Sequence, residues 1–260
     1  MKAFLELWKY RRILIATSWT DIQSRYRGTF LGMGWTVIYP ITFLSLYAIV
    51  YLLIFKIRLP NYAPFDYVLV IFSGLIPFLG FSESLSTGVG SVVANRGLIR
   101  NTMFPIELIP VKAVLASSVT MVVGLAMLLL TLWTRHAILP SQALIPVVLV
   151  LQLLFTIGII WLLSALNVFF KDLGQMIGVL ILFLMLVSPI AYTQDMIPES
   201  LMPLMYPNPL FYMVMLYRDA IVLGTIPLGL LGVFTLIALA TFFTGYHVFH
   251  RLKSMFADYV

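Results

Sequence analysis

WTVIYPITFLSLYAIVYLLIF, residues 35–55, decides the fold of this 260-residue chain. An aromatic residue stands at every fourth position of the stretch: Trp35, Tyr39, Phe43, Tyr47, Tyr51 and Phe55. On a helix this ladder of rings is about 30 Å tall, the thickness of the hydrocarbon core of a bilayer. Rings at every turn offer a surface on which flat-faced molecules, sugars included, can stack. Ordinary helix packing with some lipid-facing rings explains the spacing equally well, because aromatic residues are common in membrane helices.

The composition extends this membrane assignment to the whole chain. Hydrophobic residues make up 62% of the sequence and charged residues 10%, with a mean hydropathy of +1.04. A soluble domain of this size could not cover so much apolar surface. Long unbroken apolar runs predict helices, because the strands of a membrane barrel alternate. With no cysteine, the sequence has no disulfide, thiolate nucleophile or cysteine-ligated metal.

Six apolar runs are long enough to cross the bilayer. We predict an all-α, polytopic membrane protein with a single domain, residues 1–260, and six transmembrane helices at 31–55, 67–88, 111–133, 143–169, 173–192 and 228–249. The apolar stretch 210–222 has only ~13 residues and cannot cross. Together with the prolines before it, this stretch predicts short re-entrant or interfacial helices within residues 193–227.

The basic residues predict the orientation. With both termini in the cytoplasm, twelve of the sixteen lysines and arginines lie in cytoplasmic segments and four outside, which follows the positive-inside rule. The formal charge of +6 is then explained by contact with anionic lipid, and it requires no nucleic-acid partner.

Residues 1–28 combine apolar and basic side chains. Phe4, Trp8 and Ile13 alternate with Lys9 and Arg11, which predicts an amphipathic helix lying in the inner interface of the membrane. The basic cluster that follows contains Arg25 and Arg27. Taken one at a time, these arginines are equally consistent with a simple stop at the membrane boundary.

The loop 89–110 is the second informative segment. Asn95 is a plausible helix N-cap, and Pro105 precedes the next helix. A short helix here would present an apolar knob in a basic collar, a surface suited to a groove on a soluble partner. A membrane-surface turn with snorkelling arginines is the alternative, and the residues alone do not rank the two. The predicted knob and collar consist of Asn95, Arg96, Leu98, Ile99, Arg100, Phe104 and Pro105.

Three polar features have two interpretations each. Glu83 lies inside the second predicted span, where an ionisable group either binds substrate hydroxyls or accepts hydrogen bonds from neighbouring side chains. His247 and His250 are one turn apart, but no third metal ligand is apparent, so a polar helix end is favoured and no metal site is predicted. Arg218 and Asp219 form either a latch or an ordinary interfacial pair.

Several strings occur together in a specific order. They are Asp21…Arg25-Tyr26-Arg27…Leu31-Gly32…Trp35…Pro40, Asn95…Leu98-Ile99…Phe104-Pro105…Leu108…Pro110, Phe170-Lys171-Asp172, Ser188-Pro189-Ile190…Tyr192, Asn208-Pro209-Leu210 and Tyr217-Arg218-Asp219. Over nearly its whole length the chain thereby resembles the permease subunits of ABC transporters that export polysaccharides such as O-antigen, capsule and teichoic acid. Lys171 stands where that family usually has arginine, which keeps the charge but not the bidentate fork.

The resemblance implies a fold and an assembly. It implies a homodimer around a channel in the bacterial inner membrane, with 89–110 as the coupling segment that docks on an ATPase. It also implies a lipid-linked polysaccharide substrate and a channel lined by Tyr39, Phe43, Tyr47 and Tyr51, with Glu83 as a further candidate. Trp35 and Phe55 are expected to anchor at the interfaces. The implied periplasmic gate contains Pro189, Pro198, Asn208, Pro209, Arg218 and Asp219.

The energy for transport has to come from another subunit. The sequence lacks the Gly-x-x-x-x-Gly-Lys-Ser/Thr loop that cradles nucleotide phosphates. We therefore expect ATP and Mg²⁺ on two copies of a partner ATPase, and neither a bound cofactor nor enzymatic activity on this chain. Two alternatives stay open: an ABC permease for another substrate such as a lipid or drug, and a membrane-embedded glycan transferase, which would need a cluster of acids or histidines.

Overall fold

The computed structural model describes residues 2–50, 53, 63–97, 104–190, 192 and 196–259. Helices account for the regular structure of these residues, and no strand occurs among them, so the all-α prediction is confirmed. The main helices are α1 (Lys2–Lys9), α2 (Arg11–Tyr26), α3 (Trp35–Ile49), α4 (Pro64–Gly88), α5 (Ser91–Ala94), α7 (Leu108–Trp133), α8 (Ile145–Phe169), α9 (Leu173–Val187), α10 (Met202–Met205), α11 (Pro209–Arg218), α12 (Leu228–Leu252) and α13 (Phe256–Tyr259).

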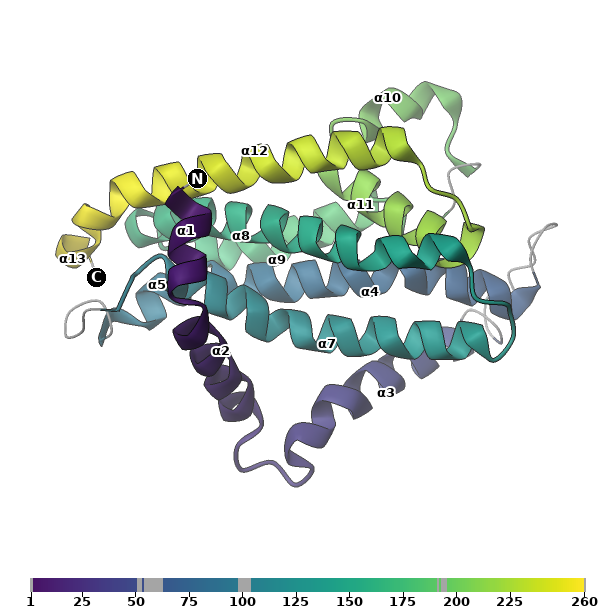
Figure 1. The fold of residues 1–260 in the computed structure, drawn as a ribbon, viewed down its shortest axis with the longest axis horizontal. Helices are drawn as coiled ribbons and strands as arrows, with labels where there is room; N and C mark the ends of the chain where they lie inside the picture. Colours follow the sequence, from purple (N-terminus) through teal and green to yellow (C-terminus); the bar gives the residue numbers. More distant parts are fainter. Residues whose placement is uncertain are drawn as a thin grey trace.

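Four long helices, α4, α7, α8 and α12, run side by side and form the body of the molecule (Figure 1). The ends of these helices at Gly88, Leu108, Phe169 and Leu252 are called the basal end below. At the centre lies α4, in whose apolar stretch 89% of the residues are buried. The core is therefore built around the second predicted span.

Two glycines let α8 and α12 approach closely. A Cβ built on Gly158 would lie 2.5 Å from the backbone carbonyl of Thr241, and one on Gly245 would overlap the Gly158 carbonyl oxygen. Small residues at such a crossing are a common device of membrane helices, because helices in lipid associate by close packing.

Within the described residues, five helical segments are long and apolar enough to span a membrane: Gly32–Ile49, Phe65–Gly88, Leu108–Trp133, Pro140–Phe169 and Leu228–Met255. They correspond to five of the six predicted spans. The predicted span 173–192 contains only the 15-residue helix α9, which is ~22 Å long and so shorter than the hydrocarbon core. The helix ends there because Pro189 forces Ser188 into an extended conformation, with ψ at 145°. A count of six spans is therefore not confirmed.

The predicted amphipathic segment 1–28 is two helices instead of one. The chain breaks at Tyr10, whose backbone is not helical. Helix α1 lies across α12, with the Phe4 ring 4.9 Å from that of Phe242. Helix α2 then leads away and forms a V with α3, whose apex stands clear of the bundle (Figure 1). The turn between the two arms uses Gly28 and Gly32, which have φ angles of 82° and 51°.

The short apolar stretch 210–222 forms a helix inside the protein. It consists of α11 followed by a π turn over Asp219–Leu223, and every side chain of 210–221 is buried. Its start is set by Asn208, whose side chain accepts a hydrogen bond from the amide of Leu210, with Pro209 as the first helical residue. The re-entrant prediction thus fits better than the interfacial one.

Substitution at the α8–α12 crossing should destabilise the fold. We expect Gly245→Val to lower the free energy of unfolding by about 3 kcal/mol, because the Gly158 backbone cannot move aside as a side chain could. Gly232→Val on the same helix is the matched control, since nothing lies within 4 Å of its Cβ position. Thermal unfolding in detergent measures both variants, and equal melting temperatures would contradict the assignment of this crossing.

Candidate functional site

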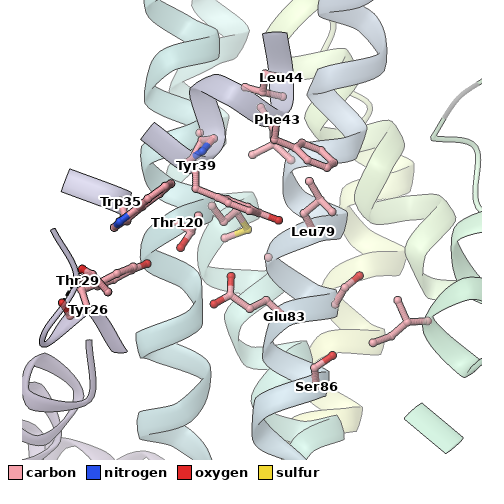
Figure 2. Close-up of a pocket in the computed structure, with 17 residues that line it drawn as sticks. Tyr26, Thr29, Trp35, Tyr39, Phe43, Leu44, Leu79, Glu83, Ser86 and Thr120 are labelled. Atoms are coloured by element: carbon pink, nitrogen blue, oxygen red, sulfur yellow. Dashed lines mark hydrogen bonds between the residues drawn. The ribbon is translucent and has the colours of Figure 1, made fainter. Parts of the chain in front are cut away.

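A cavity of ≈ 570 Å³ lies where α3 meets α4 and α7, with Ile181 of α9 at its edge. Figure 2 shows its wall, with Tyr39 of α3 and Glu83 of α4 facing the same space. The cavity is open on one side, and most of its surface is apolar. Its lining residues are Tyr26, Thr29, Trp35, Tyr39, Pro40, Phe43, Leu44, Ile76, Leu79, Gly80, Ser82, Glu83, Ser86, Thr120, Met121, Gly124 and Ile181.

Part of the aromatic ladder lines this cavity. The Tyr39 and Phe43 rings are stacked, with centroids 6.1 Å apart, and the Phe43 and Tyr47 rings are 4.7 Å apart. Tyr47 therefore continues the row of rings beyond the cavity. Trp35, which the sequence placed at an interface as an anchor, also lines the cavity. Tyr51 lies outside the described residues, so its predicted lining role stays a prediction.

Glu83 forms the polar side of the cavity together with an arginine from α2. The Arg25 guanidinium donates to the Glu83 carboxylate over 2.6 Å and to the Ser117 hydroxyl of α7 over 3.0 Å. The Ser117 hydroxyl is 2.9 Å from that of Thr87. Both members of the ion pair are about one third exposed. The partner of Glu83 is thus Arg25 on the neighbouring helix α2, 58 positions away in the sequence.

The predicted gate residues meet around the end of α9. Arg218 is 2% exposed, and its guanidinium donates to the carbonyls of Pro189, Ile190 and Tyr192 over 2.8, 3.3 and 3.1 Å. Asn208 donates to the Ser188 hydroxyl over 3.1 Å. Arg218 therefore binds the carbonyls of the segment that follows α9, and its proposed part in a gate stays a prediction.

The remaining gate residues are distributed around this centre. Pro209 begins α11, and Asp219 begins the π turn with a buried side chain. Pro198 precedes the turn Glu199–Leu201, and its carbonyl accepts from the Leu201 amide. Of the predicted gate residues, Pro189, Asn208 and Arg218 are the ones that hydrogen bonds bring together around the end of α9.

A second buried hydrogen-bond group was not evident in the sequence. The Tyr217 hydroxyl donates to the Gln152 side chain over 2.8 Å, and the Gln152 amide donates to the Pro77 carbonyl over 2.9 Å. This group joins α11, α8 and α4 in the middle of the bundle. An isolated glutamine inside an apolar run was the one available signal.

The structure describes only some of the predicted coupling residues. Leu98, Ile99 and Arg100 lie outside the described residues, so the apolar knob stays a prediction. Asn95 follows the last residue of α5, and its side chain donates to the Ser91 carbonyl and accepts from Lys112. The remaining members of the set are Arg96, which donates to the Val93 carbonyl, Phe104, which packs against the core, and Pro105, whose carbonyl accepts from the Leu108 amide.

The basic residues of the N-terminal segment have unequal surroundings. Arg11 lies 4.5 Å from the centre of the Trp8 ring and donates to the Trp8 carbonyl. Arg27 follows the last residue of α2 and is exposed. Arg25 alone among the predicted interfacial residues reaches the cavity wall.

Glu107 connects the start of α7 to the end of α12. Its carboxylate accepts from Lys253 and lies 3.0 Å from His250 Nδ1. Burial acts to raise the pKa of Glu107, but the hydrogen bonds from Lys253, its own backbone and His250 hold this pKa below its ordinary value. Glu6 and Glu107 have carboxylate oxygens within 4.8 Å of His250, whereas His247 is outside this group. Since Lys253 already supplies a cation to Glu107, the favoured interpretation of a polar helix end fits.

With this geometry established, comparison with known proteins identifies the family. Residues 13–222 match the ABC-2 type transporter family. The chain belongs to this family. Its ABC-2 relatives include an O-antigen export system permease protein, RfbA, of Klebsiella pneumoniae, 28% identical over 95% of this chain and 94% of the relative. The RfbA of Myxococcus xanthus is 30% identical over 75% and 74%. The polysialic acid transport protein KpsM of Escherichia coli is 26% identical over 84% and 86%.

Arg218 should be essential to the stability of this ABC-2 chain. Arg218→Met leaves buried carbonyls without a donor, so we expect a loss of about 3 kcal/mol in unfolding free energy. Arg218→Lys should lose less, because an ammonium keeps the charge but reaches fewer of the three carbonyls. Thermal unfolding of the detergent-solubilised protein measures this order. Arg251→Met, at an exposed position, is the matched control, and a loss of the same size there would contradict the special role of Arg218.

Proposed function

We propose that this chain is the membrane subunit of an ABC transporter that moves a lipid-linked polysaccharide, most simply an O-antigen, out of the cytoplasm across the bacterial inner membrane. The proposal draws on its ABC-2 relatives, which are named for O-antigen and polysialic acid transport. The observation that carries it is the cavity in which a row of aromatic rings faces a paired carboxylate.

This cavity has the two chemistries that a sugar chain presents. A sugar ring has an apolar face that can lie on Tyr39 or Phe43, and hydroxyls that can donate to a carboxylate such as Glu83. Contacts of this kind are individually weak and tolerate different sugars. A conduit for a polymer needs such sites, because each segment must leave as easily as it enters.

One chain supplies half of the proposed conduit. In the apolar stretch of α3 only 11% of the residues are buried, the lowest share among the five candidate spans. Tyr39 is 57% exposed within this helix. We propose that a second copy of the chain faces α3 and completes a channel between the two rows of rings.

ATP and Mg²⁺ belong to two partner ATPase subunits in this proposal. The ATPases would contact the loop 89–110, whose described residues lie at the basal end. This end, with the N- and C-termini of the chain, then faces the cytoplasm, as the distribution of basic residues predicts. Closure of the ATPases on ATP would press on the loop and move the helices around the cavity.

The rival functions find less support in the side chains. A glycan transferase needs an acid or base free to act on substrate. Glu83, the acid that lines the cavity, forms an ion pair with Arg25. A permease for a small drug or a bare lipid would have no use for a row of rings along a helix.

Assembly with an ATPase is the first test. We expect the chain, co-expressed with a candidate ABC ATPase and purified in detergent, to elute as a complex whose mass corresponds to two copies of each subunit. Mass measurement of the pulled-down complex checks this. A monomer that binds none of the candidate ATPases would contradict the proposed function.

Loss of the rings should impair export. We expect the double variant Tyr39→Leu with Phe43→Leu to reduce polysaccharide at the cell surface roughly thirtyfold, because the two lost ring contacts together remove about 2 kcal/mol of stacking. Immunodetection of surface polysaccharide, normalised to the amount of permease in the membrane, measures the effect.

Two further variants serve as controls for that result. Tyr39→Phe keeps the ring and should keep export. Phe170→Leu removes an exposed ring outside the cavity and serves as the matched control. Undiminished export in the double leucine variant would exclude these two rings from the conduit.

A further inference from the structure

Two polar contacts fasten α2 to the bundle, one helical turn apart. The Asp21 carboxylate is 3.1 Å from the ammonium of Lys112 on α7. Arg25, four residues later on the same face of α2, binds Glu83 of α4 and Ser117 of α7. The two polar contacts thus connect α2 to α4 and α7, two of the helices that line the cavity.

These two polar contacts are a large part of what holds α2 against the bundle. Of its 16 residues, only Leu14, Ser18 and Ile22 are buried. A close-packed apolar interface resists sliding, because its side chains interdigitate. A helix held mainly by hydrogen-bonded charges can shift by exchanging one partner for another. The position of α2 beside the cavity therefore depends on Asp21 and Arg25.

Lys112 connects Asp21 of α2 to the loop 89–110. Its side chain is more than nine-tenths buried, and its ammonium donates to Asp21 and, over 3.3 Å, to the side-chain oxygen of Asn95. Asn95 in turn donates to the Ser91 carbonyl at the start of α5. A buried ammonium is costly without hydrogen-bond acceptors. If Asn95 is displaced, the Lys112 ammonium must therefore move with it or bind its other acceptor, Asp21, more closely.

The contacts make a continuous line from the loop to the cavity. It runs from Asn95 through Lys112 to Asp21, along one turn of α2 to Arg25, and from there to Glu83. Each step is a direct contact or one helical turn. Glu83 ends the line at the wall of the cavity, where Figure 2 shows its carboxylate.

We propose that Lys112 is a positioning residue that transmits movement of the loop 89–110 to the cavity, by way of Asp21 and Arg25 of α2. This inference rests on the proposed function, in which an ATPase moves that loop. When Asn95 moves, Lys112 shifts its hydrogen bonds between Asn95 and Asp21. The resulting displacement of α2 changes the Arg25–Glu83 pair, and with it the polar wall that the substrate meets.

The test uses the complete complex of this chain with its ATPase, reconstituted in proteoliposomes. The measured quantity is polysaccharide exported per ATP hydrolysed. We expect Lys112→Met to lower this ratio roughly three- to thirtyfold, the range for residues along a coupling network, while co-purification with the ATPase is unchanged. Lys112→Arg, which retains the charge, should restore most of the ratio. The exchange Asp21→Lys with Lys112→Asp rebuilds the ion pair but places a carboxylate beside the Asn95 oxygen, so it should not restore the ratio.

Lys253→Met is the matched control. It also removes a lysine from an ion pair at the basal end, but its partner Glu107 connects α7 to α12 and not to α2. We expect its export ratio to equal that of the unmodified complex. A fall of the same size would show that any ion pair at this end matters, and would overturn the assignment to Lys112.

A structural readout separates transmission from simple stability. The chain contains no cysteine, so Ser86→Cys places a single thiol on the exposed part of the cavity wall. We expect the rate of its reaction with a maleimide to change when ATP is added to the complex. This change should vanish when Lys112→Met is added and persist with Lys112→Arg.

The outcomes are distinguishable. A complex that exports normally and keeps its ATP-dependent labelling with Lys112→Met overturns the inference and leaves the proposed function intact. If Lys112→Met prevents assembly with the ATPase and Lys112→Arg prevents it too, the inference is overturned in favour of a structural role for Lys112. Failure of the unmodified chain to bind an ATPase overturns the proposed function itself.

Discussion

Hydrocarbon offers no hydrogen-bond partner, so every polar group that this chain carries into the membrane has to be bound by another part of the chain. Hydroxyls along the helices donate to carbonyls one turn earlier, as Thr156 does to Gln152. Where a helix stops short, a side chain has to replace the missing turn. Arg218 does so for the carbonyls that follow α9, and Asn208 caps the helix that carries Arg218. The buried helix α11 is therefore possible only because these two residues bind backbone groups at both breaks.

The same constraint separates the core from the cavity. Gln152 and Tyr217 are buried and bind each other and a carbonyl, so this group has no capacity left for a ligand. Glu83 and Arg25 are also paired, but each is about one third exposed. A substrate hydroxyl can compete for these two side chains without leaving a charge stranded in a dry interior. The exposure of the pair, more than its presence, makes the cavity suitable for a polar substrate.

Local patterns predicted what depends on local physics. The apolar runs located the long helices, Asn208-Pro209 marked the start of α11, and the four-residue spacing of rings located the aromatic wall. The sequence could not predict which side chains, distant along the chain, pair with one another in the fold. Nothing near Glu83 in the sequence points to Arg25, and Lys112 reads as one more basic residue at a membrane boundary until Asp21 and Asn95 lie beside it. The short α9 was also missed, because apolarity continued to Pro189 although helical geometry could not.

The arrangement of strong and weak attachments has a mechanical consequence. The crossing of α8 and α12 is backbone against backbone at Gly158 and Gly245, and α4 is almost entirely buried, so these helices form a stiff frame. By contrast, α2 and α3 leave the frame as a V, and few of their side chains are buried (Figure 1). We therefore expect a force applied at the basal end to move the V before it deforms the frame, since a packed interior resists strain. Because the V carries both Arg25 and the aromatic rings, its displacement relative to α4 necessarily reshapes the cavity.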